Sequence, residues 1–412
     1  MDRIPSSIIF DIFSRVPARC LARSRCVSKI WCKYIDDRYL TIIHDKRVVE
    51  EPTPILYHYH ISIKKRTLSL CFHVSEFKQV GTTHLVFEPK KGPFLEFLRK
   101  RPPCGSSIRR IEAQGSCNGL ICLSQDDGYV ITSLAVLHPL RKEYYELPPF
   151  PLHFEKHMRR ESCGLGFDAF TNTWKMVCVL LKAYTPPDKP DMVMKNLCTM
   201  VHVFGTNSWR EIPQVSSYPV TGKAVFANGC LHWLVSHIDM KTEDGGREVI
   251  WFDVNKEEFG LIKRPKRMCD LWRNYSCYYD QLVDLNGEVG YVCSRTMEVW
   301  VLKQKEWVPH CWFEKYIIPD GYIEVLGCWN KDGDMLIKNL ADGRYAFFVY
   351  NRKSGVLHNT NVAGAGLCPD IFMYPNSLSS IRGINTNSFS VRKTGVKKSC
   401  HNIYTTNPSH MS

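Results

Sequence analysis

The sequence predicts an α+β multi-domain protein in which three short helices precede an all-β repeat domain, propeller-like with about six blades. Three observations lead to this prediction: helical apolar spacing up to about residue 45, short β-type runs after residues 50–54, and a strand-turn-strand phrase that recurs about every 49 residues. We expect the helical unit at 1–45, a linker and first β segment at 46–100, the repeat domain at 101–384 and a flexible tail at 385–412.

The composition is that of a folded globular protein. The 412 residues exceed what one hydrophobic core usually supports, and 44% of them are hydrophobic, 12% aromatic and 23% charged. Asp11 and Arg15 interrupt the first apolar stretch, so it does not fit a secretory signal. No apolar run approaches the roughly 20 residues of a membrane span. We therefore expect no membrane segment and a location in the cytoplasm, the nucleus or both.

Cysteines and net charge do not indicate a specific ligand. The 18 cysteines are scattered from Cys20 to Cys400 without a C-x-x-C pair, so we expect small buried thiols and neither a metal site nor a disulfide framework. The net charge of +13 comes from short, separated basic clusters, which are typical of solvated loops. Nucleic acid is not the expected partner, although direct binding to it remains an alternative.

The helical unit is expected to contain three helices. A proline and a serine at positions 5–6 begin the first, in the manner of an early proline and a capping hydroxyl, and Pro17 ends it. The second runs from about residue 18 to 27, and Ser28 caps a third that stops near residues 36–37.

The first helix carries more apolar surface than one core requires. Its large apolar side chains cover an arc of about 200°, whereas a surface helix usually buries little more than about 100°. Either the rest of the same chain covers the excess, or a partner helix docks against it. The pattern alone does not decide between these explanations. The side chains of the arc are Ile8, Ile9, Phe10, Ile12, Phe13 and Val16.

Ile4-Pro5, the apolar helix, Pro17 and the segment "RCVSKIW" at 25–31 closely resemble the F-box of plant F-box proteins. The resemblance implies docking onto a Skp-type adaptor and, through it, onto a cullin and a ubiquitin-conjugating enzyme. Ala22 and Ser24 depart from the bulkier apolar residues that are common there. Carried over by position, the resemblance implies that the adaptor-facing or adaptor-supporting residues are Ile4, Pro5, Ile8, Ile9, Ile12, Val16, Pro17, Val27 and Trp31.

The β-rich part contains five similar phrases, each with a strand, a polar turn and the start of another strand. Residues 203, 252, 301 and 349 occupy equivalent positions at intervals of 49, 49 and 48 residues, which is the length of one four-stranded propeller blade. The first interval is longer because it includes a loop-like insertion at 183–196. The phrases are "VLHPLRKEYYELP" from Val136, "VFGTNSWREIP" from Val203, "WFDVNKEEFGLI" from Trp251, "VLKQKEWVP" from Val301 and "VYNRKSGVL" from Val349.

Turn dipeptides and aromatic residues support the repeat. Four of the phrases place an aromatic after the turn, where we expect it to pack on the neighbouring unit: Tyr145, Trp209, Phe259 and Trp307. Hairpin turns with positive φ are favoured at Asn118-Gly119, Asn228-Gly229, Asn286-Gly287 and Asp332-Gly333. A two-sheet sandwich is the alternative, but it does not predict the period.

The segments "GSCNGLICL", "VLHPLRKEYYELPP", "GLGFDAFTNTWKMV" and "FANGCLHWLV" resemble the F-box-associated domain that often follows the plant F-box. The paired glycines of true kelch repeats are absent. This resemblance implies a kelch-like propeller that receives a target protein. Residues 55–100 are expected to supply strands to a further blade.

No catalytic residue, metal site or cofactor is predicted. The histidines of "HFEKH" at 153–157 have helical spacing, but the Glu of a zinc-protease motif is misplaced. Gly164 and Gly166 lack the rest of a phosphate-binding loop and are interpreted as turn glycines. Asp253 and Asp284 are expected to accept local backbone hydrogen bonds in turns. No cysteine has a recognisable catalytic neighbourhood.

The sequence therefore predicts a non-catalytic substrate-recognition subunit of an SCF-type cullin-RING ubiquitin ligase, which needs no cofactor and binds an unidentified target protein. The alternative is a carbohydrate-binding or carbohydrate-active propeller, which requires carboxylates and aromatics that converge at one end. The residues that bind the target are not predicted, because loops carry recognition. The insertion at 183–196 is the first place to look.

Overall fold

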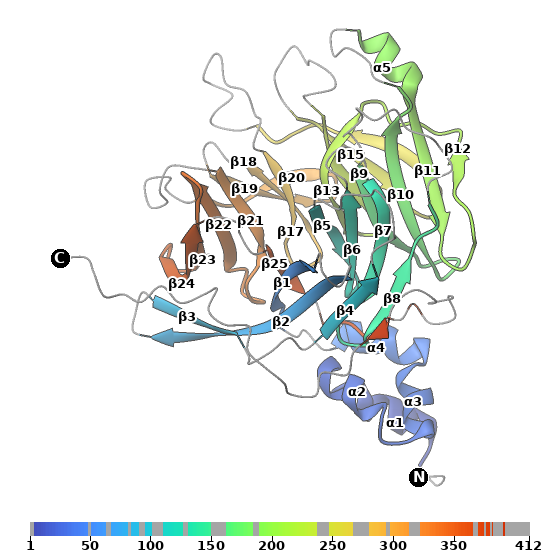
Figure 1. The fold of residues 1–412 in the computed structure, drawn as a ribbon, viewed down its shortest axis with the longest axis vertical. Helices are drawn as coiled ribbons and strands as arrows, with labels where there is room; N and C mark the ends of the chain where they lie inside the picture. The colour runs from blue at the N-terminus through green and yellow to red at the C-terminus, as the bar shows by residue number, and fades with distance from the viewer. Residues whose placement is uncertain are drawn as a thin grey trace, which may run out of the picture.

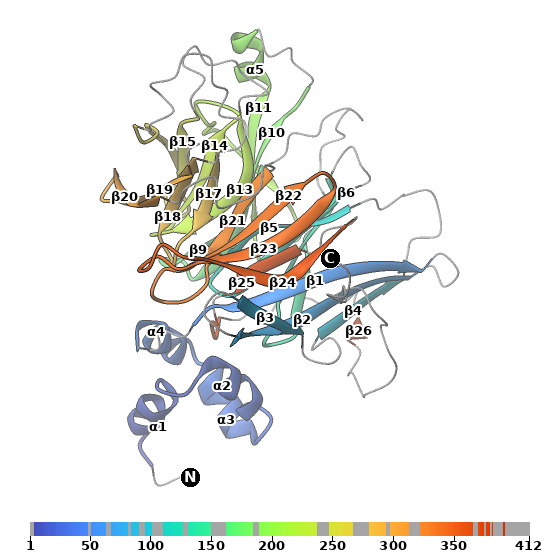
Figure 2. The ribbon, with the colours of Figure 1, turned by 90° about the vertical axis from the view of Figure 1, so that its left-hand side faces the viewer.

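A computed structural model of the chain contains an N-terminal helical unit and a six-bladed β-propeller, which confirms the predicted fold class (Figures 1 and 2). It describes residues 4–47, 51–62, 67–80, 84–89, 95–100, 110–126, 131–149, 162–183, 189–236, 247–266, 280–293, 297–312, 322–365, 370–374, 376–379, 381 and 390–391. Within these ranges, no helix is long and apolar enough to cross a membrane.

The helical unit contains four helices, α1 (Ser6–Phe13), α2 (Ala18–Ser24), α3 (Lys29–Ile35) and α4 (Arg38–Arg47). Pro5 occupies the N-cap position of α1 without a side-chain cap, so a capping hydroxyl was the wrong expectation there. Ser28 caps α3 as predicted, because its hydroxyl oxygen accepts a hydrogen bond from the Trp31 amide at 3.1 Å.

The fourth helix corrects the prediction of three helices that stop near residues 36–37. Leu40 and His44, spaced i and i+4 on α4, are both buried, with 0% and 1% of their surfaces exposed. The His44 imidazole pairs through Nε2 with the Val16 carbonyl oxygen at 2.9 Å. The buried position 44, where a helical pattern requires an apolar residue, holds a histidine. The sequence pattern therefore did not indicate this helix.

Each of the first four blades is a four-stranded antiparallel sheet with its strands in chain order. Blade 1 has β5 (Arg110–Cys117), β6 (Leu120–Asp126), β7 (Ile131–His138) and β8 (Glu143–Glu146). Blade 2 has β9 (Ser162–Asp168), β10 (Thr173–Leu181), β11 (Leu197–Val203) and β12 (Arg210–Ile212). Blade 3 has β13 (Val220–Ala227), β14 (Cys230–Val235), β15 (Val249–Asp253) and β16 (Glu258–Ile262). Blade 4 has β17 (Gln281–Asp284), β18 (Val289–Cys293), β19 (Glu298–Lys303) and β20 (Glu306–Trp312).

The last two blades share one continuous sheet, because β24 pairs with β3 over two residues. Blade 5 has β21 (Tyr322–Cys328), β22 (Met335–Ala341), β23 (Arg344–Tyr350) and β24 (Leu357–Ala365). Blade 6 has β25 (Asp370–Tyr374) innermost, followed by β1 (Thr53–Ser62) and β2 (Thr67–Val80). The first half of β2 pairs with β4 (Leu95–Lys100), and its second half pairs with β3 (His84–Pro89). Strands from both ends of the chain therefore close the ring, and residues 55–100 supply a further blade as expected.

The five recurring phrases form the hairpins between the third and fourth strands of blades 1–5, which explains their period. The predicted Asn-Gly turns join the first two strands of blades 1, 3 and 4, and the asparagines have φ between 44° and 56°. In blade 5, Gly333 alone adopts positive φ, inside a longer connection between Cys328 and Met335.

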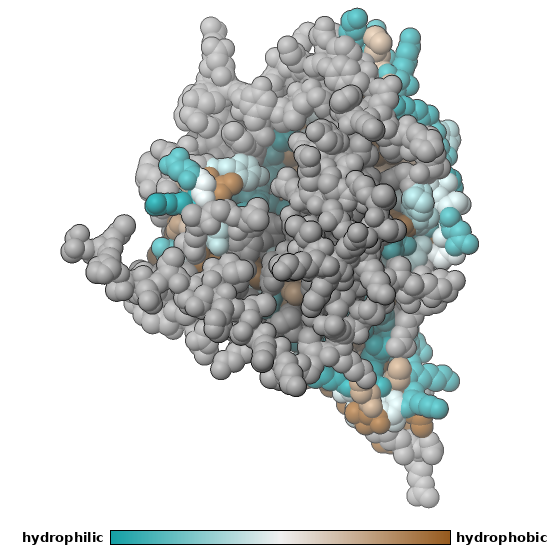
Figure 3. Space-filling model, viewed as in Figure 1, coloured by the Kyte–Doolittle hydropathy of each residue, from teal (hydrophilic) through white to brown (hydrophobic). Residues whose placement is uncertain are grey.

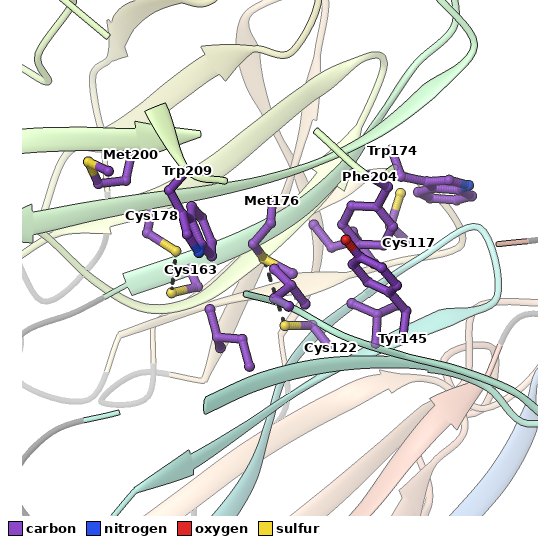
Figure 4. Packing of buried hydrophobic residues seen from close by; sticks show 14 of the residues in the cluster. Cys117, Cys122, Tyr145, Cys163, Trp174, Met176, Cys178, Met200, Phe204 and Trp209 are labelled. Atoms are coloured by element: carbon purple, nitrogen blue, oxygen red, sulfur yellow. Dashed lines mark hydrogen bonds between the residues drawn. The ribbon is translucent and has the colours of Figure 1, made fainter. Parts of the chain in front are cut away.

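Adjacent blades share buried cores, and the predicted aromatics contribute to them. Between blades 1 and 2 the core is rich in sulfur and aromatic side chains (Figure 4). There the Tyr145 hydroxyl lies 2.7 Å from His202 Nε2, and the Trp209 indole donates to the Pro148 carbonyl at 2.7 Å. Trp307 of blade 4 similarly donates to the Lys263 carbonyl after blade 3 at 2.7 Å. The expected packing on neighbouring units is confirmed at these three aromatics.

Gly164 and Gly166 lie inside strand β9, so their interpretation as turn glycines was wrong. A Cβ atom on Gly164 would approach the Ala224 and Trp233 side chains to 2.8 Å, and one on Gly166 would approach Val254 to 2.6 Å. Close packing of blade 2 against blade 3 therefore requires glycine at both positions.

The propeller has two faces. The helix-side face carries the turns at 118–119, 139–142 and 169–172 and lies next to the helical unit. The distal face, at the opposite end, carries the first residues of β9, β13 and β21 and helix α5 (Pro190–Asn196) (Figure 1). The insertion at 183–196, expected as a loop, thus contains a helix, which is anchored by buried Val193.

Two expectations fall largely outside the described residues. The histidines at 153 and 157 lie outside them altogether. Of the expected tail at 385–412, only Ser390–Val391 is described, and it forms a short strand, β26, paired with β4.

Candidate functional site

The first helix leaves part of its apolar arc exposed. Ile9 and Phe13 are buried in the helical core, with 7% and 6% of their surfaces exposed. Ile8 and Ile12, one turn apart on the flank of the helix, are 50% and 51% exposed. The explanation that the chain itself covers the whole arc is therefore wrong. Apolar side chains show on the surface of the helical unit, at the lower end of the molecule (Figure 3).

The nine residues implied by the F-box resemblance divide into an outer and an inner group. The inner group supports the core: Ile9 is buried, while Val16 and Trp31 are partly buried against it. Trp31 stacks edge-to-face on Phe13 with ring centroids 5.2 Å apart. The exposed outer group consists of Ile4, Pro5, Ile8, Ile12, Pro17 and Val27.

Three further exposed apolar residues in the helical unit were not predicted. Ile30, three residues after Val27 in the chain, is 47% exposed, and Tyr39 and Ile42 on α4 are 57% and 42% exposed. Tyr39 packs edge-to-face on Phe10 at 5.2 Å, on the flank of α1 away from Ile8 and Ile12. Ile30 lay within the matched segment, whereas the other two belong to the helix that was not predicted.

The helical unit is fixed to the propeller by ion pairs around Asp36, at the end of α3. Its carboxylate accepts hydrogen bonds from Arg141 of the β7–β8 turn at 2.5 Å and from Arg25 at 3.1 Å. Arg141, with only 1% of its side chain exposed, also binds Glu143 at 2.9 Å. Burial alone would raise the pKa of Asp36, but the two guanidinium groups hold it below its usual value.

Apolar and backbone contacts reinforce this junction. Leu378, which follows β25, is 1% exposed and belongs to the core of the helical unit, and Leu140 packs against that core. Arg141 donates to the Leu378 carbonyl oxygen at 3.0 Å, and Arg38 of α4 donates to the Ala169 carbonyl oxygen at 3.2 Å. The helical unit and the propeller thus share a core.

A cavity of about 860 Å³ lies on the propeller axis, lined by the innermost strands β5, β13, β17, β21 and β25. Its helix-side end has neutral amides and one lysine, Asn118, Asn286, Lys331 and Asn376. Its distal end carries charged and phenolic groups, Lys223, Arg247, Asp280, Tyr322 and Glu324. The volume is in the range of small-ligand pockets.

The carboxylates at the distal end are already bound to protein groups. Glu324 is paired with Lys223 and Lys338, and Asp280 accepts a hydrogen bond from the Tyr291 hydroxyl at 2.6 Å. These contacts account for both carboxylates without a ligand.

The remaining candidate groups have structural roles. Asp253 accepts hydrogen bonds from the Asn255 and Lys256 amides at 2.9 Å, and Asp284 accepts from Gly287 at 2.7 Å, as predicted for turn carboxylates. Burial raises the pKa of the Cys117 and Cys122 thiols well above their usual value, which opposes nucleophilic chemistry. Among the described residues, no group of three His, Cys, Asp or Glu side chains could hold a metal ion.

This arrangement defines a class of protein, in which a helical docking unit with an uncovered apolar flank is fused to a β-propeller. The chain belongs to the family of the F-box associated beta propeller domain, which matches residues 69–376, and the F-box domain matches residues 1–43. Both resemblances seen in the sequence are thereby confirmed. An F-box implies a Skp-type adaptor as partner.

Similar proteins are plant F-box proteins. The F-box protein CPR1 of Arabidopsis thaliana is 26% identical over 326 residues, which cover 74% of this chain and 70% of the relative. The F-box protein At1g47340 of the same plant is 24% identical over 392 residues, which cover 88% of this chain and 75% of the relative.

Proposed function

We propose that this protein is the substrate-recognition subunit of an SCF-type cullin-RING ubiquitin ligase. The observation that carries the proposal is the uncovered flank of α1, Ile8 and Ile12, on an F-box that is fixed to a propeller. The helical unit docks on the Skp-type adaptor, and the propeller receives the protein to be ubiquitinated.

The energetics of docking favour the outer group as the contact. Burying a side chain such as isoleucine completely is worth about 1.5–3 kcal/mol, and Ile4, Ile8 and Ile12 have about half of their surfaces still to bury. Neighbouring Pro5, Pro17 and Val27 extend the apolar surface. A partner helix laid against α1 would cover such a surface.

The distal face is the proposed side for the target. It lies at the opposite end of the propeller from the helical unit, so adaptor and target can bind at the same time. Helix α5 projects there from blade 2, with buried Val193 as its anchor and Met192 45% exposed. A rigid scaffold that carries variable connections is the usual arrangement for recognition.

The proposed contribution of this chain to ubiquitination is positioning rather than a side-chain reaction. Two reactants held close together gain the advantage of an effectively unimolecular step. This role requires a fixed relation between the two binding ends, and the junction at Asp36 supports it. A ligase subunit of this kind would act in the cytoplasm, the nucleus or both.

The test is co-purification of the full chain with a Skp-type adaptor. The double variant Ile8→Asp with Ile12→Asp should lose the adaptor, because two carboxylates would have to enter an apolar interface. Leu261→Asp with Val308→Asp is a matched control, since these propeller residues are 44% and 46% exposed. The control should retain the adaptor. Binding that survives in the first variant would contradict the proposal.

A further inference from the structure

The distal end of the axial cavity is shaped by an irregularity in β13. The pairing of β13 with β14 shifts between Thr221 and Val225, and Gly222 within this bulge has a φ of 82°, a conformation that favours glycine. Ser162 of blade 2 donates a hydrogen bond to the Gly222 carbonyl oxygen at 2.6 Å. The next residue, Lys223, lines the cavity.

Lys223 forms a bridge across the distal end of the cavity. Its ammonium lies 2.8 Å from the Glu324 carboxylate, which belongs to β21, so the ion pair joins blade 3 to blade 5. Lys338, the cross-strand neighbour of Glu324 on β22, approaches the same carboxylate to 3.4 Å. Two lysines therefore share one carboxylate.

The two lysines are unequal in their surroundings. The Lys338 side chain is 12% exposed, whereas the Lys223 side chain is 52% exposed. Burial opposes ionisation of Glu324, but the two ammonium groups hold its pKa below its usual value. The Glu324 side chain is only 17% exposed, so Lys223 is the member of the pair that faces solvent and can turn to another anion. If Lys223 moves to another anion, Glu324 keeps Lys338 and no carboxylate is left uncompensated.

The wall of the cavity beside this bridge is apolar. Leu326, two residues beyond Glu324 on β21, lines it and is partly exposed. Phe372 on β25 also lines the cavity and is partly exposed, but it packs toward blade 1. The site thus offers a replaceable cation next to an apolar surface. A peptide segment with an acidic side chain and a neighbouring apolar side chain matches both parts.

We propose that the distal end of the axial cavity binds an acidic, apolar segment of the target protein, whose carboxylate takes Lys223 from Glu324 while an adjacent apolar side chain packs against Leu326. This inference rests on the proposed function and specifies the chemistry of the target. The cavity accepts a single extended chain rather than a folded surface, because it is enclosed by five innermost strands.

The experiment uses the full chain in complex with the adaptor and an array of twelve-residue peptides. The array contains random sequences with a central Glu-Leu or Asp-Phe pair, and matched sequences with Gln or Asn in place of the acid. Lys223→Gln is the test variant. Lys303→Gln is the control, because Lys303 has the same exposure, 52%, and is paired with Glu288 outside the cavity.

The wild-type complex should retain acidic-apolar peptides and release their amide counterparts. Lys223→Gln should weaken binding about tenfold, as expected when one charge-assisted contact is lost, while Lys303→Gln should bind like the wild type. Binding should also weaken with added salt. Equal retention of acid and amide peptides, equal loss in both variants, or no retained peptide would overturn the inference. Absence of the adaptor from the purified complex would instead count against the proposed function.

Discussion

The helical unit and the propeller use apolar side chains in opposite ways. In blade 4, every residue of the second strand, β18, is buried. In the helical unit, α1 buries Ile9 and Phe13 and leaves Ile8 and Ile12 about half exposed. The core strands of the propeller are sealed by the neighbouring blades, whereas α1 keeps about half of Ile8 and of Ile12 on the surface. The two regions therefore differ in how much of their apolar surface this chain itself covers.

The largest expected effect comes from the core of the propeller. Trp233 of β14 is 0% exposed and packs between blades 2 and 3. Trp233→Ala should lower the free energy of unfolding by about 3–5 kcal/mol, because it leaves a large cavity. Urea unfolding of the full chain measures this loss.

Ile8→Ala provides the contrast within the same measurement. Since half of Ile8 is already exposed, the variant should lose less than about 1 kcal/mol of stability. Equal losses in the two variants would remove the distinction between the two regions.

The next effect tests whether the two regions form one body. Arg141→Met removes the guanidinium that joins Asp36 to Glu143 and leaves a buried carboxylate with fewer partners. We expect a loss of about 3 kcal/mol. Hydrogen exchange should accelerate in α3 and α4 while the amides of blade 4 keep their protection.

Lys303→Met is the control for this prediction, since its pair with Glu288 is about half exposed. It should change stability by less than about 1 kcal/mol. Unchanged exchange in α3 and α4 of Arg141→Met would show that the junction does not depend on this ion pair.

The last comparison concerns acid sensitivity, which the propeller should dominate. Burial, followed for His138 by the charge of Arg141, lowers the pKa of His138 to about 3 and that of His232 to about 4. Below the unfolded value of about 6.5, only the unfolded chain gains these protons. Stability is thus full above that pH and is lost toward pH 4, by about 1.4 kcal/mol per pH unit for each histidine.

Urea midpoints at about pH 7.5 and about pH 5.5 measure this slope. His138→Gln should show a smaller difference between the two values, because it removes one of the titrating groups. A urea midpoint at pH 5.5 that is as high as the midpoint at pH 7.5 would contradict the assignment of neutral buried histidines.

Local signals explain which parts of the fold could be predicted. Each recurring phrase is a hairpin whose turn residues lie next to its strands in the sequence. The repeat of blades 1–5 could therefore be predicted. Closure of blade 6 pairs Ile55 with Phe372, and no local pattern reports a contact over that separation. Gly164 was misinterpreted for the same reason, since the neighbours that require glycine are Ala224 and Trp233 of another blade.

The candidate site was predictable only in part. The width of the apolar arc showed an excess of apolar surface but left open what covers it, and the structure leaves Ile8 and Ile12 about half exposed. Tyr39 and Ile42 were not predicted, because the buried polar residue His44 interrupts the apolar pattern by which their helix would be recognised. The Lys223–Glu324 bridge depends on a bulge in one blade and a strand in another, so its two partners carry no shared sequence signal.

The strand order of blade 6 has a consequence for synthesis on the ribosome. Translation delivers the F-box first, but β1 must wait for β25, which emerges more than 300 residues later. Leu378, emerging later still, completes the core beneath the F-box. A chain that ends before β25 would therefore expose an unpaired edge of β1 together with an incomplete core of the helical unit.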